Sequence, residues 1–168
     1  LLLANVRNLV PAHQRMKEGG WDRHHFSGTE LMNKTIGLIG LGNVGHRVAR
    51  FCRAFDMRVL AYDPYIADEV FERHGVLKSS LKEILDEVDI LSVHTPKNKE
   101  TIGMIGASEL KSMKDGVVII NAARGGIVNE NDLLSALKAG KVGGVGIDTW
   151  EKEPPVNNPF AELPNVVM

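Results

Sequence analysis

The sequence has a single cysteine, Cys52, among its 168 residues, so no disulfide can form within the chain. This is typical of proteins from a reducing compartment, and we expect a cytoplasmic location. The 20 basic and 21 acidic residues give a formal net charge of −1, which offers no basic excess for binding nucleic acid or an anionic membrane. No apolar run approaches the ~18 residues that a transmembrane helix needs. We therefore expect neither nucleic acid nor a membrane as a partner.

The first residues, LLLANVRNLVPAHQ, lack the basic leader and the cleavage site of a signal peptide, and the chain does not begin with methionine. We interpret this stretch as the end of a helix that starts upstream, followed by a connecting arm across residues 11–30. The predicted division places the helix end and arm in residues 1–20 and one globular domain in residues 21–168. The chain is then expected to be a piece of a longer protein.

Short apolar runs alternate with helical patterns along the rest of the chain. The runs are rich in Val, Ile and Leu and do not alternate with polar residues, as is typical of strands buried on both faces of a parallel sheet. The sequence therefore predicts a three-layer, doubly wound α/β fold of the Rossmann type. Strands are predicted at residues 35–40, 58–63, 89–95, 116–123 and 143–148, with weaker candidates at 75–78 and 165–168.

Two amphipathic segments are the clearest helix candidates. Residues 45–55 place one apolar stripe on Val48, Ala49, Cys52 and Phe55. Residues 129–140 place another on Leu133, Leu134 and Leu137, with Asn129 suited to the N-cap and Gly140 to the C-cap. Residues 151–160 contain three prolines and are predicted to form a loop.

The stretch GLGNVG has the spacing G-x-G-x-x-G between the first predicted strand and the first of these helices. In such a turn Gly40 allows a tight bend, Gly42 lets a pyrophosphate approach the backbone, and Gly45 lets the helix pack close to the strand. The N–H groups of Asn43 and Val44 would face the anion at the helix N-terminus. The spacing alone is weak evidence for a nucleotide site, and a glycine-rich turn with only a structural role is the alternative.

Asp63 supports the nucleotide interpretation, since it ends the next strand 18 residues after Gly45. An acid there can accept hydrogen bonds from the hydroxyls of the adenosine ribose. Its charge would repel a 2′-phosphate, and no arginine directly follows it, so NAD is predicted rather than NADP. A flavin or another adenine nucleotide remains an alternative.

Further polar residues lie where predicted strands end, the edge at which open α/β sheets bind ligands. Arg124 follows a buried strand and could hold a carboxylate in a bidentate fork, although a solvent-facing arginine is the commoner case. Asp148 could hydrogen-bond a nicotinamide amide. Glu153 or Glu151 could be the acidic partner of a base, or solvated loop acids. His94 is expected to line the nucleotide pocket or to be packed.

Two other kinds of site lack support. No Cys, His and Asp cluster has the spacing of metal ligands, so no metal is predicted. No motif of a Ser or Cys nucleophile is present either.

Several blocks of the sequence, in order and across essentially the whole chain, resemble the NAD-dependent D-2-hydroxyacid dehydrogenases. They include WDRHHFSGTELMNKTIGLIGLGNVG, AYDPY, SVHTPKNKETIGMI, NAARGGIVNENDLLSALKAGKVGGVGIDTWEKEPP and LPNVVM. The resemblance implies NAD as cofactor and a 2-hydroxy or 2-keto acid as substrate. We expect 3-phosphoglycerate and 3-phosphohydroxypyruvate, the first step of serine synthesis, with hydroxypyruvate, glyoxylate and D-lactate left open.

The resemblance also implies a role for each matching residue. Arg124 would bind the substrate carboxylate. Glu153, rather than Glu151, would pair with the catalytic histidine and raise its pKa, and a glutamate here speaks against the formate dehydrogenase branch, which carries Gln. The implied cofactor-binding residues are Gly40, Gly42, Asn43, Val44, Gly45, Asp63, Thr95, Ala122, Ala123, Arg124 and Asp148.

The main departure from the family is the absence of its catalytic histidine. That residue belongs to a Thr-Pro-His segment just after a stretch like LPNVVM, whereas this chain ends at Met168 and has no histidine after His94. We expect a nucleotide-binding domain without its substrate domain, which binds NAD with little or no turnover. An NAD-sensing binding module, like the corepressors of this fold, is the alternative. The resemblance further implies a homodimer through the helix near Val10 and the arm around Trp21.

Overall fold

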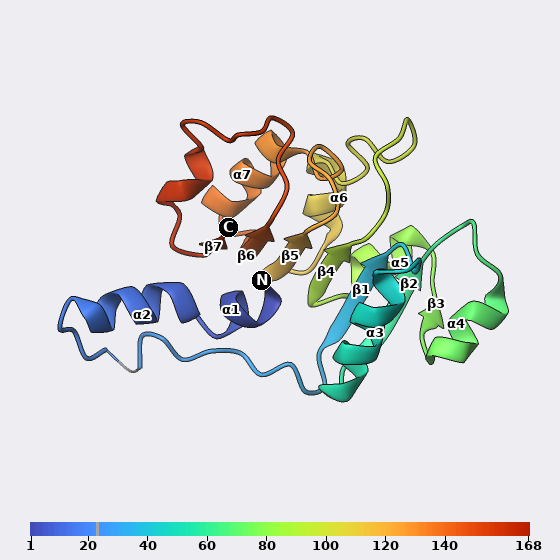
Figure 1. Cartoon of the computed structure of the whole chain (residues 1–168), viewed down its shortest axis with the longest axis horizontal. Coiled ribbons are helices and arrows are strands. Elements are labelled where there is room, and N and C mark those ends of the chain that lie inside the picture. The colour runs from blue at the N-terminus through green and yellow to red at the C-terminus, as the bar shows by residue number, and fades with distance from the viewer. Residues whose placement is uncertain (23) are drawn as a thin grey trace.

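The computed structural model describes residues 1–22 and 24–168. Seven parallel strands form one sheet in the order β3-β2-β1-β4-β5-β6-β7 (Figure 1). All seven predicted strands are present, although most are shorter than their apolar runs. Their bounds are β1 Thr35–Ile39, β2 Arg58–Tyr62, β3 Leu77–Lys78, β4 Ile90–Val93, β5 Val117–Asn121, β6 Val142–Ile147 and β7 Val166–Val167.

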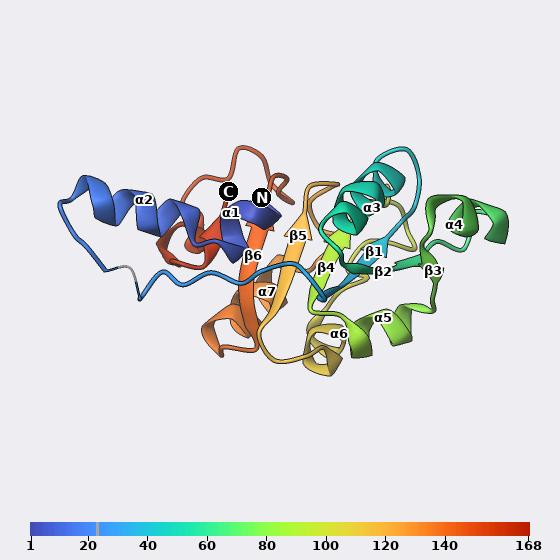
Figure 2. The ribbon, with the colours of Figure 1, turned by 90° about the horizontal axis from the view of Figure 1, so that it is seen from below.

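Helices cover both faces of the sheet, which gives the predicted three-layer Rossmann-type fold (Figure 2). All residues of β1 and β4 are buried, because each strand packs against helices on both sides. One face is covered by α1 (Leu2–Val6), α3 (Gly45–Ala54) and α4 (Asp68–His74). The other is covered by α5 (Leu81–Glu87), α6 (Ala107–Ser112), α7 (Glu130–Lys138) and the short 3₁₀ helix η1 (Pro159–Glu162).

The amino-terminal segment differs from its prediction. It is not one helix, because α1 ends at Val6 and α2 (Leu9–Lys17) begins after Asn8, whose φ of 50° is left-handed. Asparagine tolerates this conformation better than most residues. The predicted connecting arm is therefore helical as far as Lys17. Pro11 is compatible with α2 because it lies in the first turn, where its missing N–H costs nothing.

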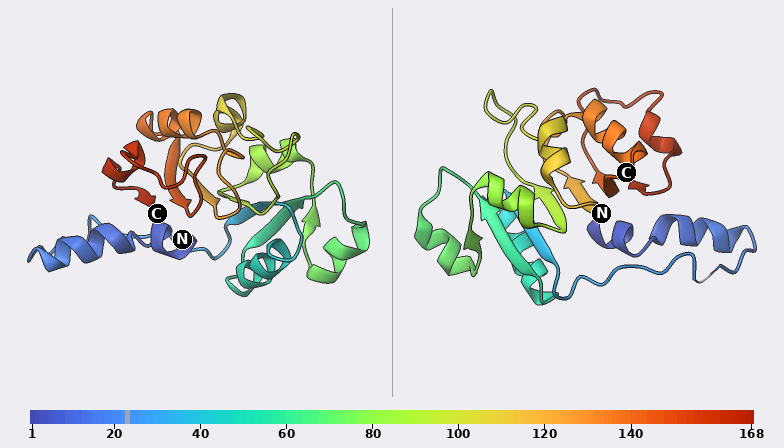
Figure 3. Two further views of the ribbon diagram at one scale, coloured as in Figure 1. Left: turned by 45° about the horizontal axis from the view of Figure 1, so that its top comes forward. Right: turned by 180° about the vertical axis from the view of Figure 1, so that it is seen from behind.

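The two amino-terminal helices make unequal contact with the domain. In α1, the Asn5 side chain donates to the carbonyl oxygens of Val145 (3.2 Å) and Asn165 (2.9 Å). In contrast, α2 has no buried residue and extends away from the sheet. Both chain ends lie beside β6, close to one another (Figure 3). No helix in the described ranges is long and apolar enough to cross a membrane.

Two details of the predicted helices need correction. Phe55 was expected on the apolar stripe of α3, but it follows the last helical residue and is 44% exposed. The C-cap of α7 is Ala139, and Gly140 comes next with a φ of 75°. Asn129 caps the start of α7 as predicted, because its side chain accepts a hydrogen bond from the Asp132 N–H. Residues 151–160 are a loop until Pro159, which begins η1.

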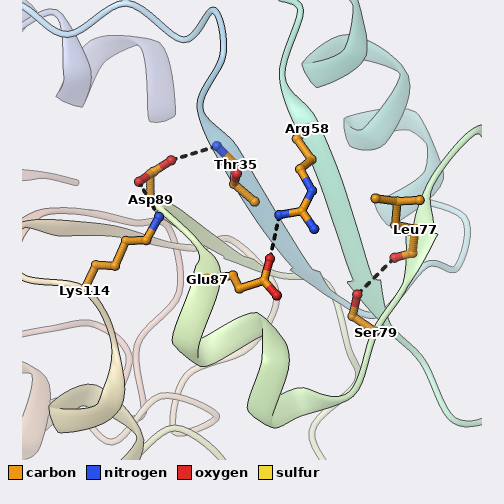
Figure 4. Close-up of polar contacts among 7 residues, drawn as sticks. All are labelled: Thr35, Arg58, Leu77, Ser79, Glu87, Asp89 and Lys114. Atoms are coloured by element: carbon orange, nitrogen blue, oxygen red, sulfur yellow. Dashed lines mark hydrogen bonds and ion pairs between the residues drawn. The ribbon is translucent and has the colours of Figure 1, made fainter.

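The amino-end edge of the sheet is held by polar contacts (Figure 4). Asp89 accepts hydrogen bonds from the Thr35 N–H (2.8 Å) and from the Lys114 Nζ (3.0 Å). Burial raises the pKa of Asp89, but these two donors outweigh burial and the net pKa is lowered. Arg58 and Glu87 form a further ion pair at 2.6 Å. The opposite, carboxyl edge carries the residues that the sequence singled out.

Candidate functional site

The glycine turn after β1 has the geometry that its spacing predicts. Gly40 has a φ of 95°, and a Cβ on it would lie 2.7 Å from the His94 carbonyl oxygen. A Cβ on Gly45, the first residue of α3, would lie 2.2 Å from the Gly40 carbonyl oxygen. A Cβ on Gly42 would meet no heavy atom within 4 Å. Gly40 and Gly45 are therefore required by packing, whereas Gly42 is required only if something binds beside it.

The N-terminus of α3 offers donors to a ligand. No side chain caps this helix, and within residues 1–22 and 24–168 no acceptor is bonded to the N–H of Asn43 or Val44. Both residues are exposed. Unpaired N–H groups at a helix start carry partial positive charge and suit a phosphate. The turn thus fits the pyrophosphate of a dinucleotide in donors and in open space.

Asp63 follows β2 and connects the neighbouring loops. Its Oδ2 accepts from the Leu41 N–H (2.9 Å), inside the glycine turn, and its Oδ1 accepts from the Tyr65 N–H (3.0 Å). Each carboxylate oxygen can accept a further hydrogen bond. The half-buried carboxylate therefore positions the turn and still has capacity for hydroxyl groups of a ligand. Sequence reasoning identified Asp63 but missed its contact with Leu41.

The glycine turn and the ends of β4 and β5 meet around a hollow of about 250 Å³. Its lining combines residues that the sequence placed on three separate strand ends. They are Val44, His94, Thr95, Pro96, Ala122, Ala123 and Arg124. The ends of β4 and β5 therefore converge here as predicted, whereas Asp63, Gly125 and Asp148, which were predicted to join them, do not line this hollow.

His94 lines this hollow and is also packed. Its Nε2 lies 2.9 Å from the Ser92 Oγ, and burial lowers the pKa of the imidazole to about 4. The ring is therefore neutral at physiological pH.

Acid is expected to destabilise the protein through His94. In the unfolded chain the imidazole titrates near 6.5, so between pH 6.5 and 4 the unfolded state holds a proton that the folded state lacks. The free energy of unfolding then falls as pH decreases, by about 2 kcal/mol at pH 5. Urea unfolding at pH 7 and pH 5 measures this loss. The His94→Gln protein should lose less unfolding free energy between these two pH values. An equal loss in both proteins would show that His94 is not the source of the pH dependence.

The turn after β5 is organised by Asn121, which sequence reasoning missed. This buried side chain accepts from the Ala123 N–H (3.2 Å) and donates to the Arg124 carbonyl oxygen (3.0 Å). The Arg124 guanidinium donates to the Ala123 carbonyl oxygen (2.7 Å) and is otherwise exposed. A polar residue at the end of an apolar run was the available signal. Asn121 fixes the backbone from which Arg124 projects.

Arg124 also lines a second hollow, of about 300 Å³, together with the loop after β6. Gly125 brings the two segments into contact, because a Cβ on it would lie 1.9 Å from the Trp150 carbonyl carbon. Glu153 faces this hollow and accepts from the Trp150 N–H (2.9 Å). The full lining is Lys97, Arg124, Gly125, Thr149, Trp150, Glu151 and Glu153. Lys97 is a second cation here, and sequence reasoning did not select it.

The remaining candidates are placed less distinctively. The Asp148 N–H donates to the Asn121 carbonyl oxygen (3.0 Å), but the Asp148 side chain is exposed and lines neither hollow. Glu151 is exposed, and its N–H donates to a carboxylate oxygen of Glu130 (2.6 Å). Among the described residues, no group of three or more His, Cys, Asp or Glu side chains could hold a metal ion.

Comparison with known proteins supports one family. All of residues 1–168 match the family model described as D-isomer specific 2-hydroxyacid dehydrogenase, NAD binding domain. The chain is 49% identical to a D-3-phosphoglycerate dehydrogenase of Archaeoglobus fulgidus across 99% of the chain and 32% of that protein. It is 41% identical to the enzyme of that name from Rattus norvegicus, across 99% of the chain and 31% of that protein. The chain thus spans about a third of these curated relatives.

Solved structures of similar proteins share the fold. A formate dehydrogenase from Granulicella superposes with a TM-score of 0.94 at 27% identity, across 99% of this chain and 46% of that one. A D-lactate dehydrogenase from Aquifex aeolicus, complexed with NAD and lactic acid, gives 0.84 at 38% identity across 90% of this chain and 45% of that one. The chain therefore belongs to the NAD-binding domain family of the D-isomer specific 2-hydroxyacid dehydrogenases, and its cofactor is NAD.

Proposed function

We propose that the chain is the cofactor-binding part of an NAD-dependent oxidoreductase that interconverts 3-phosphoglycerate and 3-phosphohydroxypyruvate. The names of its curated relatives, at 40–49% identity, support this substrate. The observation that carries the proposal is the place of Arg124, which lines both the hollow beside the glycine turn and the hollow that contains Glu153. Because Arg124 borders both hollows, its guanidinium can hold the carboxylate of a 2-hydroxy acid next to a bound nicotinamide.

The proposed cofactor contacts follow from the geometry of the carboxyl edge. The N–H groups of Asn43 and Val44 hold the pyrophosphate, and Asp63 accepts hydrogen bonds from the adenosine ribose. Bound NAD supplies the hydride acceptor of the oxidation. The remaining proposed contacts to it come from Gly40, Gly42, Gly45, Thr95, Ala122, Ala123, Arg124 and Asp148. Of these, Asp148 has the least support, because its side chain faces solvent in this structure.

The proposed substrate contacts lie in the second hollow. The Arg124 guanidinium binds the substrate carboxylate through paired N–H donors and orients the reacting carbon. The Glu153 carboxylate, which accepts a hydrogen bond from the Trp150 N–H, orients an imidazole. During oxidation this imidazole takes up the proton of the substrate hydroxyl group. The carboxylate stabilises the protonated ring and so raises its pKa. None of the described residues that line the second hollow is a histidine, so we propose that this imidazole comes from outside that set of residues.

Titration with NAD and NADP tests the cofactor site. Calorimetry should show NAD binding to residues 1–168, with NADP weaker by at least about tenfold, because the Asp63 charge repels a 2′-phosphate. Asp63→Asn removes the charge but keeps an oxygen that can accept from the Leu41 N–H. It should therefore reduce the preference for NAD over NADP without unfolding the turn. Glu69→Gln, an exposed neutralisation on α4, is the control. Equal binding of NAD and NADP to the unaltered chain would contradict the role of Asp63.

We propose that the protein is cytoplasmic.

We further propose that two copies of the chain associate through α1 and α2. The apolar side chains of Leu9, Val10, Met16 and Trp21 are 52–76% exposed on a helix and arm that extend from the domain. Such clustered apolar exposure is typical of an interaction surface. Light scattering should give twice the chain mass of 18.4 kDa. Val10→Glu should shift it toward the monomer, and a monomeric unaltered chain would contradict the proposal.

A further inference from the structure

Two exposed side chains meet above the carboxyl edge of the sheet, outside both hollows. The Tyr65 hydroxyl donates a hydrogen bond to the Glu100 carboxylate. Tyr65 lies in the loop that follows β2, and Glu100 lies in the loop that follows β4. Since β1 lies between β2 and β4 in the sheet, this contact passes over the end of β1. The glycine turn begins at that point.

The backbone at each end of the contact is held in place, whereas the side chains are exposed. The Tyr65 N–H donates to Asp63, whose other carboxylate oxygen accepts from the Leu41 N–H in the glycine turn. The loops after β1 and β2 and the Tyr65–Glu100 contact therefore form one continuous chain of hydrogen bonds. The hydrogen bond to Glu100 raises the pKa of the Tyr65 phenol, which stays a donor at neutral pH.

The loop that presents Glu100 is stiffened by its own hydrogen bonds. The Asn98 Oδ1 accepts from the N–H groups of Glu100 (2.9 Å) and Thr101 (3.1 Å). The Thr101 hydroxyl, which is buried, donates to the Pro96 carbonyl oxygen (2.7 Å). Glu100 is thus positioned by its backbone, and the Tyr65 side chain, which is 73% exposed, has room to rotate away from it.

We propose that Tyr65 and Glu100 form a clasp that closes over the adenosine half of bound NAD and slows its release. The proposal rests on the proposed cofactor site, because it places the adenosine ribose at Asp63, two residues before Tyr65. A clasp that closes behind the ligand must open for release, so its loss speeds dissociation. The contact is already formed in the ligand-free chain, so it must also open for entry, and its loss should speed association as well.

Stopped-flow release of NADH from residues 1–168 into excess NAD, followed by NADH fluorescence, tests the clasp. Tyr65→Phe and Glu100→Ala should each speed release roughly three- to tenfold, the range expected for one lost hydrogen bond. The double variant should release NADH no faster than either single variant, since both remove the same contact. Glu72→Ala, which truncates an exposed glutamate on α4, should leave release unchanged.

Other outcomes overturn the clasp. Release rates within twofold of the unaltered chain would show that the contact does not restrain the ligand. Faster association with unchanged release would show that the pair obstructs entry instead. ADP-ribose, which keeps the adenosine half, should be released faster by the same factor as NADH. Absence of NADH binding to the unaltered chain would instead count against the cofactor site, so the two failures are distinguishable.

Discussion

Gly42→Ala is expected to weaken NAD binding by roughly 10- to 100-fold while leaving the fold intact. A Cβ at this position meets no heavy atom of the protein within 4 Å, so the folded chain accommodates the methyl group without strain. The same open space is where a pyrophosphate would contact the N–H groups of Asn43 and Val44. The methyl group would therefore collide with the ligand alone. Calorimetric titration with NAD and thermal unfolding without NAD measure the two effects separately.

Gly45→Ala is the matched comparison, because the same methyl group would lie 2.2 Å from the Gly40 carbonyl oxygen. Backbone atoms cannot rotate away as a side chain can, so this variant should lose stability as well as NAD affinity. If Gly42→Ala bound NAD as well as the unaltered chain, the open side of the turn would not be the ligand's side. The glycine spacing would then be structural only.

Much of the fold was predictable because apolar runs and turn residues agree along the chain. Strands buried on both faces are nearly continuous in Val, Ile and Leu, and β1, β4 and β5 follow this pattern with one or two exceptions each. The interruption between α1 and α2 was less predictable, since it depends on one residue, Asn8, adopting a left-handed conformation. The exposure of Phe55 likewise depends on where α3 ends, and helix ends are set by local geometry more than by pattern.

The candidate site was predictable where a residue type has a fixed place relative to a strand. Gly40, Asp63 and Arg124 follow β1, β2 and β5, and the parallel sheet brings those ends to one edge. Asn121 and Lys97 were missed for a different reason. The Asn121 side chain acts by hydrogen-bonding to backbone groups of the turn. Lys97 reaches the second hollow from the loop after β4. Neither placement is encoded in spacing along the chain.

Gly125→Ala is expected to cost about 3 kcal/mol of stability, which corresponds to a fall in melting temperature of roughly 6–12 °C for a chain of this size. A Cβ on Gly125 would lie 1.9–2.2 Å from the Trp150 carbonyl group and the Glu151 nitrogen. All three are backbone atoms, so the turn after β5 must move away from the loop after β6. Thermal unfolding by circular dichroism measures the loss, with Gly42→Ala as the same substitution in open space.

The consequence for the site is as large as the consequence for stability. Arg124 and Glu153 line one hollow because Gly125 lets the turn after β5 approach the backbone of Trp150 and Glu151. Separating them should displace the guanidinium from the carboxylate that Trp150 holds, while the glycine turn at the other end of the edge stays as it is. NAD affinity should therefore fall less in Gly125→Ala than in Gly42→Ala. The melting temperature, in contrast, should fall more in Gly125→Ala than in Gly42→Ala. A Gly125→Ala protein as stable as Gly42→Ala would contradict the close backbone contact on which the second hollow depends.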